Sequence, residues 1–245
     1  AFDYALLVDE HFIGGYLEKA KTLEELGEYQ EAIDNYLITL NIDDPTAFVN
    51  IRIGECYKKL DKYDAAISYY KKAVHEDPLL EKGWILLADI YYDDKNYQKA
   101  AYYIAETLKI DDDNSAYWKR YSEIKMKLNF YEEAVSGFEK CLELGNNDLE
   151  IYIALVDVLS FLGDFNKAIS VLYDAQKMYK NFAEIEYRLA GLFLTLNNEN
   201  YGFNHLIVGL NLDYEYHVIL KEIYPIVLEN KKVQKLIIDF KKDLE

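Results

Sequence analysis

The three arginines of the chain are its most informative residues for binding chemistry. Arg52, Arg120 and Arg188 recur at one constant interval, and they are the only arginines among 27 basic residues. A guanidinium is planar and presents its N–H donors as a fork, which suits carboxylates and carbonyl oxygens. The regular spacing indicates that the three occupy one structural position that recurs along the chain.

A row of acidic residues recurs at half that interval. Its members are Glu55, Asp89, Glu123 and Asp157. Side chains three or four residues apart are neighbours on a helix. The sequence therefore predicts three ion pairs within helices, which are Arg52–Glu55, Arg120–Glu123 and Glu184–Arg188.

The sequence offers no recognisable catalytic or metal-binding pattern. The four histidines fall at unrelated places and have no metal-ligand spacing. Ser136-Gly137 lacks the preceding glycine of a nucleophile elbow. Asp111-Asp112-Asp113 is not followed by the glycine and glutamate of a calcium loop. We expect no enzymatic activity, no cofactor and no bound metal.

Composition narrows the class of partner. A net charge of −17 and a pI near 4.7 argue against nucleic acid, because that binding depends on neutralising phosphates with Lys and Arg. No apolar run approaches the roughly 18 residues of a membrane span. Cys56 and Cys141 are isolated in the pattern and are expected to be free, buried thiols. This predicts a reducing, cytoplasmic location.

The elements that position these residues repeat with a fixed period. Units begin at Ile13, Ala47, Glu81, Ser115, Leu149, Ala183 and, less clearly, His217. Small residues recur at position 8 (Ala20, Gly54, Ala88, Ser122, Val156, Ala190) and at position 20 (Ala32, Ala66, Ala100, Ala134, Ala168, Gly202). Bulky residues recur at position 24, namely Tyr36, Tyr70, Ile104, Phe138, Leu172 and Leu206. This pattern predicts two closely packed helices per unit.

Residues that are typical of turns and helix ends separate the predicted helices. Position 15 is Gly, Asp or Asn in five of six units and Lys95 in the third, which predicts a left-handed turn inside each unit. Asp44-Pro45 and Asp77-Pro78 are predicted to start the following helices as cap and first residue.

The repeats divide the chain into three parts. Residues 1–12 are predicted to be the end of a preceding, truncated repeat, and six repeats occupy residues 13–216. Residues 217–245 are predicted to form a degenerate seventh repeat, broken at Pro225, and a capping helix with a lysine-rich outer face.

These repeats resemble the tetratricopeptide family. The resemblance is carried by Gly54, Tyr57, Tyr63, Ala66, Tyr70, Ala73 and Pro78, and by Trp84, Leu87, Ala88, Tyr91, Tyr97 and Ala100. It implies an all-α, right-handed superhelical solenoid of 34-residue helix-turn-helix repeats whose first helices line a concave groove. A groove of this kind implies a protein or peptide partner.

The groove positions implied by the resemblance contain the arginines and the acidic row. They also contain Lys82, Lys119, Tyr92 and Tyr187. In one interpretation the arginines anchor carboxylates or carbonyl groups of a bound peptide. In the other they form ion pairs that space the repeats. The pattern of the family's chaperone-tail clamp is not matched, since Leu17 and Leu86 stand at two of its polar positions.

We therefore expect a non-catalytic scaffold that binds a protein or peptide segment in its groove. The alternative is a structural module that self-associates or separates domains of a longer multi-repeat protein. Exposed apolar residues in the groove or at the truncated N-terminal end would favour self-association, whereas a groove rich in Arg, Asp and Tyr favours ligand binding.

Overall fold

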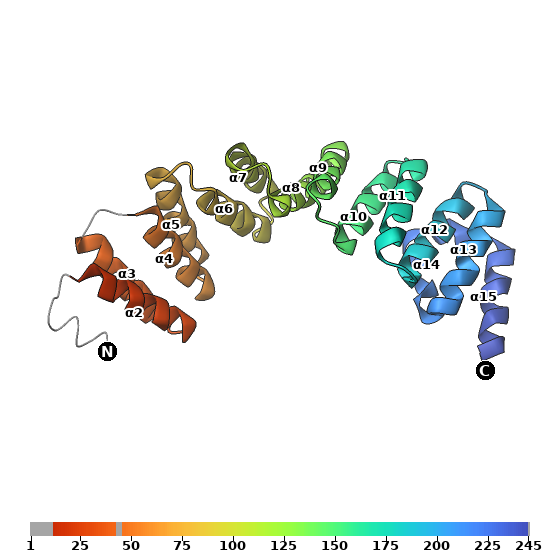
Figure 1. Cartoon of the computed structure of the whole chain (residues 1–245), viewed down its shortest axis with the longest axis horizontal. Coiled ribbons are helices and arrows are strands. Elements are labelled where there is room, and N and C mark those ends of the chain that lie inside the picture. The colour runs from red at the N-terminus through yellow and green to blue at the C-terminus, as the bar shows by residue number, and fades with distance from the viewer. Residues whose placement is uncertain (1–11, 43–45, 245) are drawn as a thin grey trace. The chain divides into compact units, whose positions relative to one another are not determined.

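The computed structural model describes residues 12–42 and 46–244, and these residues form helices and short connections without any strand. The helices follow one another in pairs (Figure 1). The pairs are α2 (Ile13–Glu25) with α3 (Tyr29–Ile42), α4 (Ala47–Lys59) with α5 (Tyr63–Glu76), α6 (Glu81–Asp93) with α7 (Tyr97–Ile110), α8 (Ser115–Lys127) with α9 (Tyr131–Glu143), α10 (Leu149–Phe161) with α11 (Phe165–Met178), and α12 (Ala183–Thr195) with α13 (Glu199–Leu212). The predicted all-α repeat architecture is confirmed.

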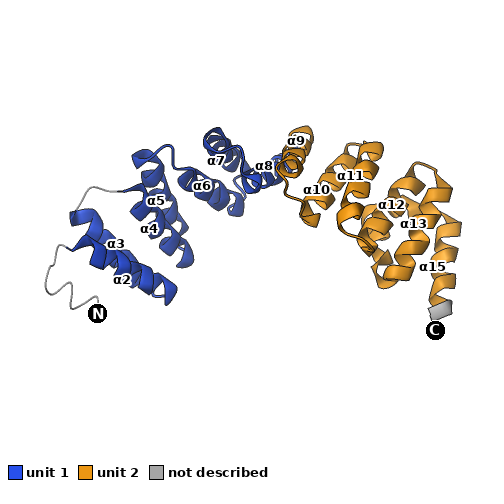
Figure 2. Cartoon of the chain, in the orientation of Figure 1, with its two compact units in different colours: residues 1–129 blue, residues 130–245 orange. Residues whose placement is uncertain are grey.

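The helices group into two compact units (Figure 2). The first comprises residues 1–129 and contains α2 to α8, and the second comprises residues 130–245 and contains α9 onwards. The boundary falls between α8 and α9, inside the fourth predicted repeat. The arginines are thus divided, with Arg52 and Arg120 in the first unit and Arg188 in the second.

Each turn within a pair is closed by a residue with a left-handed backbone. These residues are Gly27, Asp61, Lys95, Asn129, Gly163 and Asn197, all with φ between 57° and 81°. Around Asp61, the Lys62 N–H donates to the Tyr57 carbonyl at 3.0 Å, which satisfies an otherwise free carbonyl at the helix end. Lys95 adopts the same conformation although its side chain does not favour it, because the turn demands that backbone.

One of the predicted helix starts is wrong. Helix α6 begins at Glu81 rather than at Pro78, and Asp77 is the C-cap residue that follows α5. The Asp77 carboxylate accepts from the Leu79 N–H at 3.0 Å, so the Asp-Pro pair forms a turn that precedes the helix instead of its first residues. Asp44 and Pro45 lie outside the described residues, as do residues 1–11 of the predicted truncated repeat.

Packing inside a pair follows the alternation of small and large residues. The position-20 alanines and the position-24 side chains are fully buried or nearly so. Gly54 on α4 shows why the small residue is required, since a Cβ there would overlap the Tyr70 ring on α5. Close contact and dense packing between the two helices therefore depend on the missing side chain at Gly54 and on the large side chain of Tyr70.

Tryptophans tie two first helices to the connections that precede them. The Trp84 indole N–H on α6 donates to the Pro78 carbonyl at 2.9 Å. The Trp118 indole N–H on α8 donates to the Asp112 carbonyl at 2.7 Å. Each bond fixes the chain between two consecutive repeats.

The C-terminal end departs from the pattern at Pro225, as predicted. The short helix η1 (Glu215–Val218) leads into α14 (Ile219–Ile223), and a second short helix, η2 (Pro225–Glu229), follows. Pro225 has no N–H to continue the hydrogen-bond series. Helix α15 (Lys231–Leu244) then buries Val233 and Ile237 and exposes Lys231, Lys232 and Lys235.

Replacing the buried Ala100 of α7 with leucine should destabilise the first unit. Ala100 has no exposed surface, so the added carbons must separate packed helices, at a cost of about 1–3 kcal/mol in the free energy of unfolding. Urea unfolding followed by circular dichroism measures the change. The matched control is Gln98→Leu on the exposed side of the same helix. Equal effects of the two substitutions would contradict the packing role of Ala100.

Candidate binding surface on the first helices

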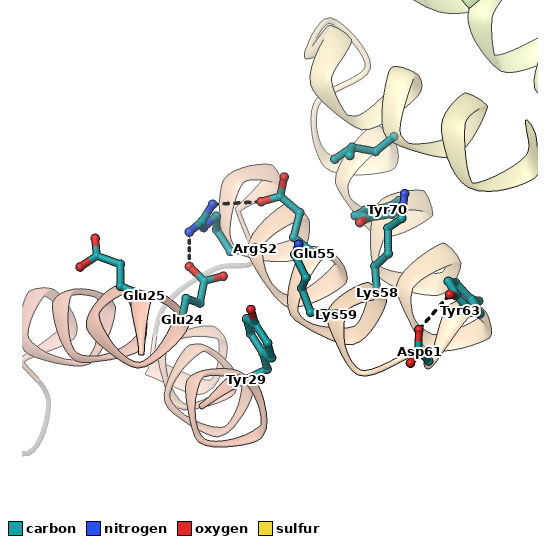
Figure 3. A pocket seen from close by; sticks show the side chains of 11 residues that line it. Glu24, Glu25, Tyr29, Arg52, Glu55, Lys58, Lys59, Asp61, Tyr63 and Tyr70 are labelled. Atoms are coloured by element: carbon teal, nitrogen blue, oxygen red, sulfur yellow. Dashed lines mark hydrogen bonds and ion pairs between the residues drawn. The ribbon is translucent and has the colours of Figure 1, made fainter. Parts of the chain in front are cut away.

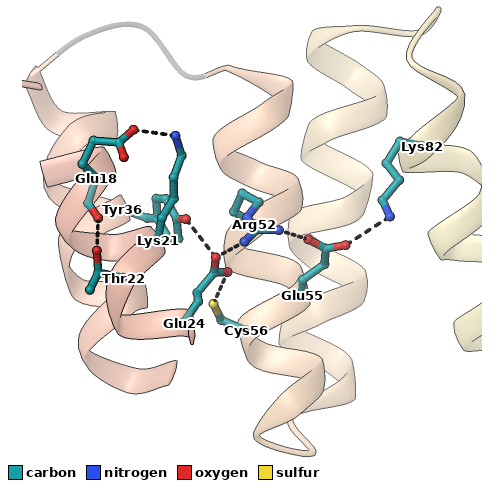
Figure 4. Close-up of polar contacts among 9 residues, drawn as sticks. All are labelled: Glu18, Lys21, Thr22, Glu24, Tyr36, Arg52, Glu55, Cys56 and Lys82. Atoms are coloured by element: carbon teal, nitrogen blue, oxygen red, sulfur yellow. Dashed lines mark hydrogen bonds and ion pairs between the residues drawn. The ribbon is translucent and has the colours of Figure 1, made fainter. Parts of the chain in front are cut away.

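Arg52 lies at the centre of a polar network that joins two consecutive repeats (Figure 4). Its guanidinium is paired with Glu24 on α2, and it donates to Glu55 one turn along α4 at 3.0 Å. Glu55 is also paired with Lys82 on α6, with 3.2 Å between Oε1 and Nζ. The network therefore runs from α2 through α4 to α6 on the first-helix side of the repeats.

Glu24 is the point at which this network meets the core. Its carboxylate accepts from the Tyr36 hydroxyl of α3 at 3.1 Å and from the Cys56 thiol of α4 at 2.9 Å. Burial alone would lower the pKa of the Arg52 guanidinium, but Tyr36 and the carboxylates of Glu24 and Glu55 raise it above its ordinary value. The surroundings therefore favour the charged form of Arg52 in its pair with Glu24.

Arg120 repeats the arrangement two repeats later. Its Nε donates to Asp89 of α6 at 2.7 Å, and Nη1 donates to Glu123 of its own helix at 2.6 Å. Its guanidinium also lies 4.6 Å from the centre of the Tyr92 ring, a cation–π distance. Arg120 thus joins α8 to α6.

Arg188 is the most enclosed of the three. Its side chain is 5% exposed, and its Nε donates to Glu184 of the same helix at 2.9 Å. Its other partner is Asp157 on α10. Burial alone would lower the pKa of Arg188, whereas Asp157 and Glu184 raise it above its ordinary value.

All three arginines pair both within their helix and with the first helix of the preceding repeat. The three predicted pairs within helices are confirmed. The pairs between helices were not predicted, although a signal was present. Asp89 precedes Arg120 by the same interval by which Asp157 precedes Arg188, and this interval is one helical turn shorter than a repeat.

The remaining predicted groove residues fall into different environments. Lys82 is exposed beside Glu55, whereas Lys119 is half-buried. Tyr92 is half-buried between Arg120 and Tyr97.

The prediction that Tyr187 lies on the groove surface is wrong. Tyr187 is fully buried, and its hydroxyl donates to the Asp213 carbonyl at 2.8 Å. Its ring fills the space beside Gly209 of the second helix, so this side chain belongs to the core of its repeat.

A pocket of about 670 Å³ opens beside the Arg52 network (Figure 3). Its wall comes from α2, α4 and α6 and from the second helices α3 and α5. Charged groups of both signs and apolar groups line it, including Arg52, Glu55, Lys59, Tyr63 and Leu86. Three successive repeats thus contribute to one concave site within the first unit.

Tyr70 contributes an unusual group to this pocket. The residue has no exposed surface, and its hydroxyl has no hydrogen-bond partner among the described residues. Burial raises the pKa of the Tyr70 hydroxyl well above its ordinary value, so the group is a neutral phenol at physiological pH. A buried hydroxyl without a partner is unfavourable, and a ligand that supplies one relieves that cost.

Two other kinds of site are absent from the part of the chain that is described. Residues 12–42 and 46–244 hold no group of three or more His, Cys, Asp or Glu side chains arranged for a metal ion. None of the described helices combines the length and the apolar character that crossing a bilayer requires.

Two matches to the tetratricopeptide repeat family cover residues 59–124 and residues 149–182. Paired helices that repeat at regular intervals define a helical repeat protein. The chain belongs to the tetratricopeptide repeat family.

Similar proteins and structures agree with this assignment of the fold. Anaphase-promoting complex subunit 3 of Schizosaccharomyces pombe is 18% identical over 195 residues, which are 80% of this chain and 29% of that protein. The chain therefore spans less than a third of the length of this relative.

Two solved structures are similar along most of their length. The C-terminal part of a repeat-containing protein from Cytophaga hutchinsonii has a TM-score of 0.73 and 17% identity, with 96% of this chain and 91% of that chain covered. YrrB, described as a tetratricopeptide protein with an unusual peptide-binding site, has a TM-score of 0.57 and 16% identity. The coverage is 91% of this chain and 98% of YrrB.

Removing Arg188 should destabilise the second unit far more than removing an exposed partner of an ion pair. Arg188→Ala removes a guanidinium that is 5% exposed and leaves Glu184 with only the Tyr216 hydroxyl as a partner. Because Asp157 is 43% exposed and can be solvated, we expect a loss below the ~3–5 kcal/mol that is typical of fully buried pairs. Urea unfolding measures the loss. The control is Lys177→Ala on α11, whose pair with Asp174 is exposed and should contribute about 0–1 kcal/mol. Similar losses for both variants would refute the structural role of Arg188.

Cys56 should react with thiol reagents only when the protein unfolds. Burial and the neighbouring Glu24 carboxylate raise the pKa of the Cys56 thiol, so the reactive thiolate is scarce near neutral pH. Cys141 is also buried. We expect slow labelling by iodoacetamide at pH 8 in buffer and rapid labelling of both residues in urea, counted by mass spectrometry. Rapid labelling of Cys56 in the folded chain would contradict the network around Glu24.

Proposed function

We propose that the chain is a non-catalytic scaffold that binds a segment of another protein on the surface formed by its first helices. In the first unit the anchoring site is the pocket beside Arg52. The buried Tyr70 hydroxyl in its wall is the observation that carries the proposal. A peptide backbone offers both N–H and C=O groups, either of which would give this hydroxyl its missing partner.

The arginines support this surface rather than contact the ligand. Arg52 is already engaged by Glu24 and Glu55, so a ligand carboxylate would have to displace one of them. The contacts favour the interpretation in which the arginines space the repeats. Fixed spacing prepares the pocket in advance, which lowers the conformational cost of binding.

The wall of the pocket suits a ligand with an apolar side chain. Tyr29, Tyr63 and Leu86 supply apolar surface, and four carboxylates, Arg52, Lys58 and Lys59 supply charged groups of both signs. Ligand sites combine apolar surface with polar groups that fix the orientation of the ligand. Two similar proteins support a role in binding other proteins. Anaphase-promoting complex subunit 3 is a subunit of a complex, and YrrB is described as having a peptide-binding site.

Tyr70→Phe separates binding from stability in the first unit. It deletes only a hydroxyl that has no partner in the folded chain, so the melting temperature should stay the same or rise. If a bound segment supplies the partner, its affinity should fall by about two- to tenfold. Proteins captured from a lysate of the source cells by the immobilised chain provide the ligands, and their affinities are then measured individually.

A charge-matched pair of variants locates the surface. Lys59→Glu with Tyr63→Ala alters the pocket, and Lys71→Glu with Tyr102→Ala makes the same changes at exposed residues outside it. We expect the first variant to lose captured proteins that the second retains. Retention by both would refute the pocket as the binding site. A wild-type dimer that the first variant alone disrupts would instead support the self-association alternative.

A further inference from the structure

A second pocket lies in the second unit and differs in character from the first. Its volume is about 380 Å³, and its wall comes from α10, α11, α12 and the break between α14 and η2. Apolar side chains dominate this wall, namely Phe161, Phe165, Ile223, Pro225 and Ile226. The size is at the lower end of the roughly 300–1,000 Å³ that is usual for ligand sites.

This pocket exists because the seventh repeat departs from the others. Gly191 on α12 stands at the position where four earlier repeats carry the acidic residue. A Cβ at Gly191 would overlap the Tyr224 ring, so only glycine lets that ring pack against the helix. Pro225 ends α14 directly afterwards. The ring and the break together form one side of the cavity.

Two hydroxyl groups in the wall lack partners. Tyr224 is 7% exposed, and both its hydroxyl and the Ser160 hydroxyl are buried without a hydrogen bond to any described residue. Burial raises the pKa of the Tyr224 hydroxyl, and the neighbouring Ser160 hydroxyl lowers it. Both residues line the pocket. The combination of an apolar cavity with unpaired polar groups points to a ligand that has both kinds of surface.

Residues on the rim of the pocket indicate which chemical group of a ligand would lie beside its apolar part. Phe161 and Ile226 stand largely exposed on it, with 69% and 67% of their surfaces accessible. Asp157 is the charged residue of the wall, and its side chain remains 43% exposed although Arg188 pairs with it. A cationic group beside the apolar one would complement this carboxylate.

We propose that this pocket binds an extended peptide segment of another protein through one leucine- or phenylalanine-sized side chain. A basic residue next to that side chain faces Asp157, and the peptide backbone pairs with the hydroxyls of Tyr224 and Ser160. The site is independent of the pocket beside Arg52, so the failure of either proposal leaves the other standing.

Short synthetic peptides test the chemistry directly on the whole chain. The probes are the capped tetrapeptide Gly-Lys-Leu-Gly and its versions with Phe, Ala or Asp in place of Leu. Titration into the ¹⁵N-labelled chain, followed by amide chemical shifts, should locate binding of the Leu and Phe peptides at Thr195 and Ile223. The Ala peptide should bind about tenfold more weakly, because it buries less apolar surface. The Asp peptide should not bind.

Variants establish that the pocket is responsible. Ile226→Glu places a charge on the exposed rim and should abolish binding of the Leu peptide, whereas Ile238→Glu on α15, also exposed but outside the pocket, should not. Tyr224→Phe keeps the ring against Gly191 and removes only the hydroxyl. It should weaken binding about fivefold and leave the melting temperature the same or higher. Tyr70→Phe in the first unit should have no effect on this peptide.

Four results would overturn the proposal. The first is equal affinity for the Leu and Ala peptides, and the second is undiminished binding to Ile226→Glu. The third is a wild-type dimer in sedimentation equilibrium that Ile226→Glu converts to a monomer, since the occupant would then be a second copy of the chain. Absence of any binding by the Leu and Phe peptides at millimolar concentration would refute it equally.

Discussion

The close approach of two helices at small residues is the constraint on which the rest of this structure depends. Where Gly54 faces Tyr70, the helices can touch only because one side chain is missing. The same alternation of small and large residues recurs at positions 20 and 24 of the six complete repeats. Each of these contacts fixes the distance between two helices and the angle at which they pack. Within each unit, the first helices of successive repeats therefore lie side by side.

On these first helices, charge is used mainly to hold the repeats together. Each arginine reaches back to a carboxylate of the preceding first helix, and Glu24 additionally connects its arginine to Tyr36 and Cys56. The side-chain exposure of the arginines falls from 33% at Arg52 to 5% at Arg188, so the same residue type makes contacts of unequal strength. Partly buried pairs are less screened than exposed ones. The surface available to a ligand is therefore the space between these pairs.

Both candidate pockets occur where a tyrosine from a neighbouring element lies beside a glycine of a first helix. Tyr70 packs over Gly54, and Tyr224 packs over Gly191. In each case the ring is buried while its hydroxyl has no partner among the described residues. The packing that makes the helices fit thus leaves a polar group at the wall of a cavity. Both candidate pockets thus arise as a side effect of close packing.

The repeat period by itself determined the helical class, the pairing of helices and the residues of the left-handed turns, because these depend on local backbone preferences and on which side of a helix is apolar. The ion pairs within helices were predictable for the same reason, since three- and four-residue spacing is a local geometry. The sequence did not predict that Asp77-Pro78 forms a turn before α6, because a turn and a helix start use the same residue types. The burial of Tyr187, the pairing of arginines with preceding repeats and both pockets were decided only by the tertiary structure. They depend on which side chains from separate helices meet, and a repeat pattern specifies the position of a residue in its own helix but not what packs against it.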